Sequence, residues 1–312
     1  MGIAAVFPGQ GSQFVGMGAD LARRWEPAAE VFETVDRALG FSLSRLCWEG
    51  PEEELRLTAN TQPALLAHSV AAWRVLEAEG FQVRAMAGHS LGEYSALVAA
   101  GALPLEEAAR LVRRRGELMQ EAVPVGRGAM AAVIGLEEPE LVSVCEESSS
   151  EAAVVVPANF NAPGQVVIAG EAGAVRRAAE LARERGARKV IPLRVSAPFH
   201  SPLMRPAREA LEPHLRAAAW SDPRVPVYRN VDAAPARRGT EAMEGLIRQV
   251  DSPVLWTETI RRMRADGTDT FLEVGAGTVL CGLIRRIDRG ARCAPAGTVE
   301  QIETVLEEMG DG

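Results

Sequence analysis

The stretch Val83-Arg84-Ala85-Met86-Ala87-Gly88-His89-Ser90-Leu91-Gly92 joins a short buried-strand pattern at residues 83–87 to a Gly-x-Ser-x-Gly turn. A helical pattern follows over residues 91–100, and Gly101 closes it. A strand, a sharp turn and a helix in this order form a nucleophile elbow, in which small glycines let the chain turn tightly and expose the serine hydroxyl. The stretch therefore predicts an α/β fold with Ser90 as a catalytic nucleophile, against the alternative of an ordinary surface turn.

Strand and helix patterns alternate over the rest of the chain, which is typical of an α/β fold with a parallel sheet. Further strands are expected at residues 3–7 and 270–274, and further helices at 61–79 and 105–121. Between them lie strand 129–134, helix 138–147, strands 153–157 and 165–169, helix 172–185 and strand 189–195. This βαββαβ order is the ferredoxin-like pattern. We therefore predict a parallel-sheet core, residues 1–126 and 196–312, with an inserted ferredoxin-like subdomain, residues 127–195.

Composition limits the classes of function that remain. The 312 residues are 47% hydrophobic, and the formal net charge of −8 gives no basic footprint for nucleic acid. The scattered cysteines form no CxxC pair and are expected to be reduced thiols rather than metal ligands: Cys47, Cys145, Cys281 and Cys293. We find neither a secretory leader pattern nor an apolar stretch that could span a bilayer, so the sequence predicts a cytoplasmic protein without a membrane segment.

A serine nucleophile needs a base, and the chain has four histidines. His68 and His214 lie within helical patterns, and His89 is held beside the nucleophile by the turn. His200 lies in the proline-braced run Ser196-Ala197-Pro198-Phe199-His200-Ser201-Pro202, where a loop holds its residues rigidly. Elimination therefore selects His200, although a capping or packing histidine would fit the same turn.

The glycine-rich turn Phe7-Pro8-Gly9-Gln10-Gly11-Ser12-Gln13 follows the first strand and invites a nucleotide-binding interpretation. That interpretation fails on spacing, because Phe14 stands where GxGxxG requires its third glycine. The Gly275-Ala276-Gly277 turn fails in the same way at Leu280. A glycine-rich turn at the end of a parallel strand can instead offer a backbone N–H to an oxyanion beside the elbow.

Five motifs follow one another along the chain: Phe7-Pro8-Gly9-Gln10-Gly11-Ser12-Gln13, Gly88-His89-Ser90-Leu91-Gly92-Glu93-Tyr94, Arg115-Gly116-Glu117-Leu118-Met119-Gln120, Asn159-Phe160-Asn161-Ala162-Pro163-Gly164-Gln165 and Phe199-His200-Ser201. In this order, and over essentially the whole chain, they resemble the malonyl-CoA:acyl-carrier-protein transacylase family. The resemblance implies a hydrolase-like α/β core with an inserted ferredoxin-like subdomain, in agreement with the strand order.

The resemblance also implies roles for individual residues. Ser90 would be the acylated nucleophile and His200 its general base and acid, while the backbone N–H groups of Gln10 and Leu91 would form the oxyanion hole. Arg115 would bind the malonyl carboxylate, which suits a guanidinium because it can donate two parallel charge-assisted bonds. Consecutive arginines splay about 100° apart on a helix, so Arg113 and Arg114 are expected on its solvated face.

Further pocket positions follow from the same resemblance: Gln62, Met119, Asn159 and Phe199. From the residues alone, Gln62 could equally cap a helix, Met119 could pack in the core and Asn159 could lie in a turn. A bulky Phe199 before the histidine is typical of malonyl rather than methylmalonyl selection.

The family orients its histidine with a backbone carbonyl, here that of Gln249, so we expect a Ser–His dyad without a third carboxylate. Two departures stand out. Ser252 replaces the usual Asn before Pro253, which we expect to loosen His200 somewhat, and Ala276 replaces a Pro in the Gly-x-Gly turn.

The resulting expectation is ping-pong transfer from malonyl-CoA to the phosphopantetheine thiol of an acyl carrier protein, by a monomer with no permanently bound cofactor and no metal. The carrier would belong to fatty-acid synthesis or, alternatively, to a polyketide synthase that this chain serves in trans. A serine thioesterase or esterase and a non-enzymatic docking scaffold stay open as further alternatives. Carrier proteins of this kind are acidic, so a local basic patch is expected, and the candidates are Arg188, Lys189, Arg205 and Arg208.

Overall fold

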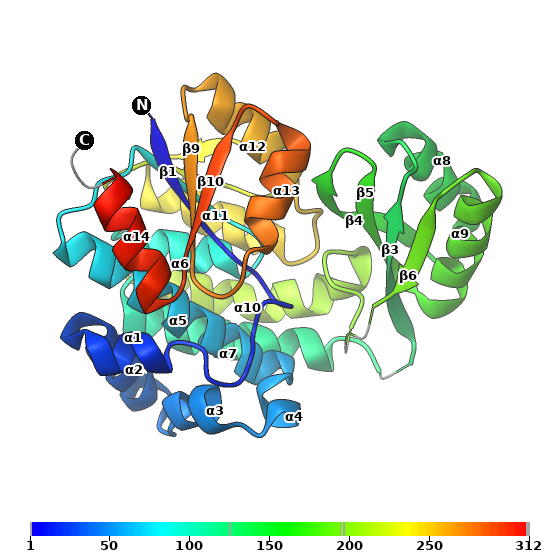
Figure 1. Cartoon of the computed structure of the whole chain (residues 1–312). Helices are drawn as coiled ribbons and strands as arrows, with labels where there is room; N and C mark the ends of the chain where they lie inside the picture. The colour runs from blue at the N-terminus through cyan, green and yellow to red at the C-terminus, as the bar shows by residue number, and fades with distance from the viewer. Residues whose placement is uncertain (1, 125, 194, 196, 310–312) are drawn as a thin grey trace.

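Two β-sheets organise the chain (Figure 1), which the computed structural model describes at residues 2–124, 126–193, 195 and 197–309. The larger sheet has the strand order β10-β9-β1-β2-β7-β8. Its strands are β1 (Ile3–Phe7), β2 (Ala85–Gly88), β7 (Val227–Tyr228), β8 (Pro235–Ala236), β9 (Thr270–Val274) and β10 (Arg292–Ala296). Every pairing is parallel except that of β7 with β8. The predicted parallel core is therefore confirmed.

Helices cover both faces of this sheet, which is why its central strands are apolar on both sides. In β1, Ala5 and Phe7 face one hydrophobic cluster, while Ala4 and Val6 face another. The first cluster holds α1 (Ala19–Arg24), α2 (Glu26–Leu39), α3 (Leu43–Glu49), α4 (Glu52–Leu55), α5 (Thr58–Ala78), α6 (Gly92–Ala99), α7 (Leu105–Glu121), α10 (Arg205–Ala217), α11 (Gly239–Gln249) and α14 (Val299–Met309). The second holds α12 (Trp256–Ala265) and α13 (Val279–Ile287). A short 3-10 turn, Pro202–Met204, precedes α10.

The smaller sheet lies to one side of the larger one, drawn in green in Figure 1. Its elements are β3 (Gly128–Ile134), α8 (Glu138–Ser148), β4 (Val155–Ala162), β5 (Gln165–Glu171), α9 (Ala172–Glu184) and β6 (Lys189–Pro192), and its antiparallel strand order is β4-β5-β3-β6. Alternation along β3 gives the sheet two different faces. Ala131 and Val133 pack under α8 and α9, whereas Met130 and Ala132 face a cavity between the sheets.

Most predicted elements coincide with observed ones, but two strands of the smaller sheet differ. β4 extends to Ala162, beyond the expected end at residue 157, so Asn159 lies in a strand and not in a turn. β6 ends at Pro192, and Arg194, inside the expected strand 189–195, lies outside the described residues. Ser196, where the parallel-sheet core was expected to resume, also lies outside the described residues. The boundaries between the core and the inserted subdomain, at residues 126/127 and 195/196, therefore stay a prediction.

The expectation of four reduced thiols is wrong for one pair. Cys281 of α13 and Cys293 of β10 form a disulfide, with their Cα atoms 5.2 Å apart. The chain reverses direction after α13, so β10 lies beside that helix and the two cysteines come together. A spacing of 12 residues in the sequence does not reveal this contact. Cys47 and Cys145 are free and buried, and burial raises the pKa of each thiol to about 12. Among the described residues, no helix combines the length and apolar character that a membrane crossing requires.

Candidate active site

Ser90 lies at the turn between β2 and α6, as the elbow pattern predicts. Its φ of 51° is in the left-handed region, which non-glycine residues rarely occupy. Gly92 makes the turn possible, because a Cβ there would lie 2.0 Å from the carbonyl oxygen of Phe7. The Ser90 hydroxyl therefore projects at the start of α6, where the first N–H groups of the helix have no partner within it.

Ser90 and His200 are in direct contact. The Oγ of Ser90 lies 2.7 Å from Nε2 of His200. Nδ1 of His200 lies 2.9 Å from the carbonyl oxygen of Gln249 and 3.2 Å from that of Ser252. Gln249 ends α11, and the last carbonyls of a helix have no partner within it, so one of them is free to accept this bond. The side chain at position 252 is not involved in the contact.

The pKa of His200 is lowered to about 3, first by burial and then by the nearby charge of Arg115. The imidazole is therefore neutral near pH 7 and able to accept a proton from Ser90. The other histidines have different surroundings. His68 contacts the carbonyl oxygen of Gly297 at 2.8 Å, His89 contacts Oδ1 of Asn161 at 2.8 Å, and His214 lies in the last turn of α10.

Arg115 is buried and directed at Ser90. Its Nη2 donates to Oγ of Ser90 at 3.1 Å and to Oε1 of Gln249 at 2.9 Å, and its Nη1 donates to Oε1 of Gln62 at 2.8 Å. Burial lowers its pKa, but a guanidinium keeps its proton in proteins. These acceptors are neutral, so the cation lies beside Ser90 with no carboxylate bonded to it in the described structure. Arg113 and Arg114 instead pair with Glu117 at the surface of α7, as expected.

Close packing of α5 against α7 brings Gln62 to Arg115. Gly116 makes this approach possible, because a Cβ there would lie 2.7 Å from Cα of Ala59. Gln62 is 1% exposed and its Nε2 lies 3.9 Å from Sδ of Met119. The alternative of a helix-capping Gln62 is therefore wrong, since the side chain lies inside the molecule.

A cavity of about 300 Å³ joins these groups to the smaller sheet. Eight of the residues expected from the sequence line it: Gln10, Gln62, Ser90, Arg115, Met119, Asn159, Phe199 and His200. Leu91 and Gln249 are buried behind Ser90 and His200. Gln10 lies in the turn after β1, which adjoins the elbow because His89 donates its N–H to the carbonyl oxygen of Phe7 at 3.0 Å.

The sequence did not predict that the smaller sheet contributes residues to the lining of the cavity. Met130, Ala132 and Val167 line the cavity on β3 and β5, on the face opposite α8 and α9. The period-two alternation of these strands could have identified that face, but not what it faces. The described residues contain no cluster of three or more His, Cys, Asp or Glu side chains suited to a metal ion.

Comparisons with known proteins show the family to which this chain belongs. The family model described as "Acyl transferase domain" matches residues 5–304. This chain belongs to the acyl transferase domain family. It is 51% identical to the malonyl CoA-acyl carrier protein transacylase of Haemophilus influenzae, with 97% of this chain and 98% of that protein covered. It is 46% identical to the protein of the same name from Bacillus subtilis, with 98% and 97% covered.

A solved structure extends this likeness to three dimensions. The malonyl transacylase bound to a type II polyketide synthase acyl carrier protein superposes on this acyl transferase with a TM-score of 0.96. The two are 45% identical, and 98% of this chain and 99% of the other are covered. The resemblance inferred from the five motifs is confirmed.

Proposed function

We propose that this acyl transferase moves a malonyl group from malonyl-CoA to the phosphopantetheine thiol of an acyl carrier protein, through a malonyl ester on Ser90. The observation that carries the proposal is the contact of the buried Arg115 guanidinium with Oγ of Ser90 at 3.1 Å. A buried cation bonded only to neutral groups favours an anionic ligand, and its distance from the nucleophile suits an acyl chain that ends in a carboxylate. The names of the relatives support the same substrate.

Acylation begins when His200 accepts the hydroxyl proton of Ser90 at Nε2 and Oγ attacks the thioester carbonyl carbon. The carbonyl oxygen becomes negatively charged and accepts hydrogen bonds from the backbone N–H groups of Gln10 and Leu91. The carbon–sulfur bond then breaks, and His200 returns its proton to the departing sulfur of coenzyme A. The carbonyl oxygens of Gln249 and Ser252 hold the imidazole in the required tautomer throughout.

Transfer to the carrier reverses these steps. His200 accepts the proton of the phosphopantetheine thiol, the sulfur attacks the malonyl ester, and Ser90 departs as the hydroxyl with the proton from His200. The same groups serve both halves of the reaction, so no resident cofactor or metal is needed. Gln62 holds Arg115 in place, and Met119, Asn159 and Phe199 shape the space for the short acyl chain.

Fatty-acid synthesis is the process to which we assign the carrier, and a polyketide carrier is the second candidate because a structural neighbour is bound to one. We further propose a monomer located in the cytoplasm, with residues 127–195 as the inserted subdomain. A thioesterase is disfavoured, because Nδ1 of His200 contacts carbonyl oxygens where such enzymes use a carboxylate, and because hydrolysis has no use for Arg115.

Mass spectrometry of Ser90 tests the proposal. The protein is mixed with equal concentrations of malonyl-CoA, acetyl-CoA and methylmalonyl-CoA, and the acyl group on Ser90 is identified before and after addition of an acyl carrier protein. We expect malonyl-Ser90 that persists in water and discharges onto the carrier thiol. Loss of the adduct by hydrolysis alone would favour the thioesterase, and absence of any adduct would favour a docking scaffold.

A further inference from the structure

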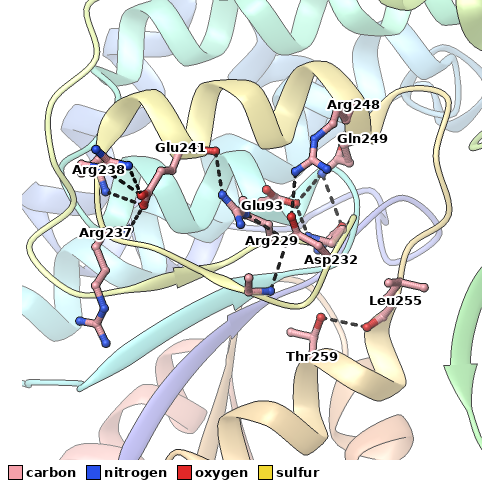
Figure 2. Close-up of polar contacts among 12 residues, drawn as sticks. Glu93, Arg229, Asp232, Arg237, Arg238, Glu241, Arg248, Gln249, Leu255 and Thr259 are labelled. Carbon is pink, nitrogen blue, oxygen red and sulfur yellow. Dashed lines mark hydrogen bonds and ion pairs between the residues drawn. The ribbon is translucent and has the colours of Figure 1, made fainter.

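A buried carboxylate lies behind the nucleophile and takes no part in the mechanism above. Glu93, in the first turn of α6, is 1% exposed. Its Oε2 accepts a bond from the backbone N–H of Asn230 at 3.0 Å and another from Nε2 of Gln249 at 2.8 Å. Figure 2 shows Glu93 beneath α11, close to Gln249 at the C-terminal end of that helix. One carboxylate oxygen thus joins two chain segments that are far from it in sequence.

Both partners of Glu93 hold the backbone of the elbow. Asn230 accepts from the N–H of Ser90 through Oδ1 at 2.7 Å and donates to the carbonyl oxygen of Gly88 through Nδ2 at 2.7 Å. Gln249 donates to the carbonyl oxygen of Ser90 through Nε2 at 3.0 Å. The left-handed conformation of Ser90 is strained for a non-glycine residue and persists only where surrounding contacts enforce it. These three bonds are such contacts.

Gln249 also connects the elbow to both other members of the site. Its side-chain Oε1 accepts from Arg115 at 2.9 Å, and its backbone oxygen accepts from His200 at 2.9 Å. An amide group has one donating and one accepting end, and Oε2 of Glu93 is the acceptor in both of its bonds. Glu93, together with the Ser90 carbonyl oxygen, therefore fixes the direction of the Gln249 amide: Nε2 faces these two acceptors, which leaves Oε1 facing Arg115. Were the amide reversed, its N–H₂ would oppose the guanidinium and Arg115 would lose an acceptor.

A shell of ion pairs fastens the segments that carry these partners, as Figure 2 shows. Asp232 accepts from Arg229 at 3.0 Å and from Arg248 at 2.8 Å, so it joins the two residues next to Asn230 and Gln249. At the other end of α11, Glu241 accepts from the backbone N–H of Arg237 and Arg238. Arg229 donates to the carbonyl oxygen of Glu241 at 3.4 Å, so the segment that carries Asn230 is bonded to both ends of α11.

We propose that Glu93 is a positioning residue that sets the direction of the Gln249 amide and, through it, the placement of Arg115 and the conformation of Ser90. Glu93 touches no substrate. Its effect falls most on the carboxylated acyl chain, because Arg115 serves that chain and not acetyl. This inference rests on the proposed malonyl transfer.

The test compares acylation of Ser90 in the full-length protein and three variants. Glu93→Ala removes the acceptor, and we expect the rate of malonylation to fall 10- to 100-fold while that of acetylation falls less, so that the malonyl-to-acetyl ratio drops. Glu93→Gln keeps an acceptor oxygen able to receive both bonds, and we expect it to retain activity within about threefold. Ser95→Ala, at a buried position on the same helix, is the matched control and should keep the wild-type ratio.

Either of two outcomes would overturn the inference: a wild-type malonyl-to-acetyl ratio in folded Glu93→Ala, or Glu93→Gln as impaired as Glu93→Ala. Should Glu93→Ala fail to fold, Glu93→Asp replaces it, because a carboxylate withdrawn by one methylene should lower the ratio in the same direction. A wild-type protein that malonylates Ser90 while Glu93→Ala keeps its ratio refutes only this inference. A wild-type protein that is not acylated at all refutes the proposed function.

Discussion

Nη2 of Arg115 lies 3.1 Å from Oγ of Ser90, so this hydroxyl shares its environment with a buried cation. Two charge-assisted bonds to a carboxylate contribute on the order of 3–4 kcal/mol. Replacing Arg115 by Met should therefore lower kcat/KM for malonyl-CoA by about 100-fold or more. Acetyl transfer should stay level or rise. Steady-state assays with malonyl-CoA and acetyl-CoA measure both rates. Arg114→Met is the control, because Arg114 pairs with Glu117 at the surface of the same helix. An equal fall with both thioesters would contradict the assignment.

The pH dependence of acetyl transfer should reveal the effect of Arg115 on His200. Burial, and after it Arg115, lower the pKa of His200 to about 3, so the neutral base persists well below pH 7 and acetyl transfer should lose no activity to His200 protonation down to about pH 5. In Arg115→Met the cation is gone and the pKa should rise towards its ordinary value. The acid limb of kcat/KM for acetyl-CoA should then move to higher pH. His89 and Glu93, the other titratable groups nearby, are common to both proteins, so an unmoved limb would refute this coupling.

Local patterns were sufficient to predict much of this molecule. The Gly-x-Ser-x-Gly turn between a strand and a helix correctly predicted the elbow at Ser90, because an elbow is made by residues adjacent in sequence. Elimination among four histidines selected His200, and the structure places it in contact with Ser90. Arg115 and the pocket residues needed the family resemblance, because nothing in a run of three arginines says which one points inward.

Contacts between distant segments could not be predicted in this way. Asn230 and Gln249 lie 137 and 156 residues from Glu93, and only the folded sheet brings them together. The Cys281–Cys293 disulfide was missed for the same reason, since it depends on how α13 returns to β10. The end of β4 was misplaced because pairing with β5 carries the strand past Pro157, where the sequence pattern stopped.

Phe199 should restrict branching of the acyl chain. It lines the cavity beside His200, and we expect its ring to crowd an α-methyl group next to the reacting carbonyl. Phe199→Ser should raise the ratio of methylmalonyl to malonyl transfer by about tenfold, because one crowded methyl group corresponds to roughly 1–3 kcal/mol. The competition assay on Ser90 measures the ratio directly. Met119→Ala enlarges the same cavity elsewhere, and an equal increase in that variant would show that volume alone, not position 199, controls selection.

Glu93 should make the free energy of unfolding depend on pH. Burial raises its pKa to about 7, with Asp232 adding to this rise, while bonds from Asn230 and Gln249 and the charge of Arg229 oppose it. The pKa is higher in the folded state than in the unfolded one, so the folded state binds more protons and stability is lost as pH rises towards 7. Glu93→Gln does not titrate. The unfolding free energy of Glu93→Gln minus that of the wild type should therefore increase by up to about 3 kcal/mol between pH 4.5 and 7.5. Urea denaturation of both proteins at each pH measures this difference. A difference independent of pH would show that Glu93 titrates normally.

The Cys281–Cys293 disulfide should stabilise the end of the larger sheet where β10 forms the edge. Closing a loop of this length restricts the unfolded chain and contributes about 2–3 kcal/mol. Cys281→Ser should lower the free energy of unfolding by that amount under oxidising conditions. The difference should vanish when both proteins are reduced with dithiothreitol, because the wild type then also lacks the bond. Cys145→Ser, which removes a buried free thiol from helix α8, is the control, and its effect should not change with reductant. If the wild type unfolds identically with and without dithiothreitol, the bond contributes nothing to stability.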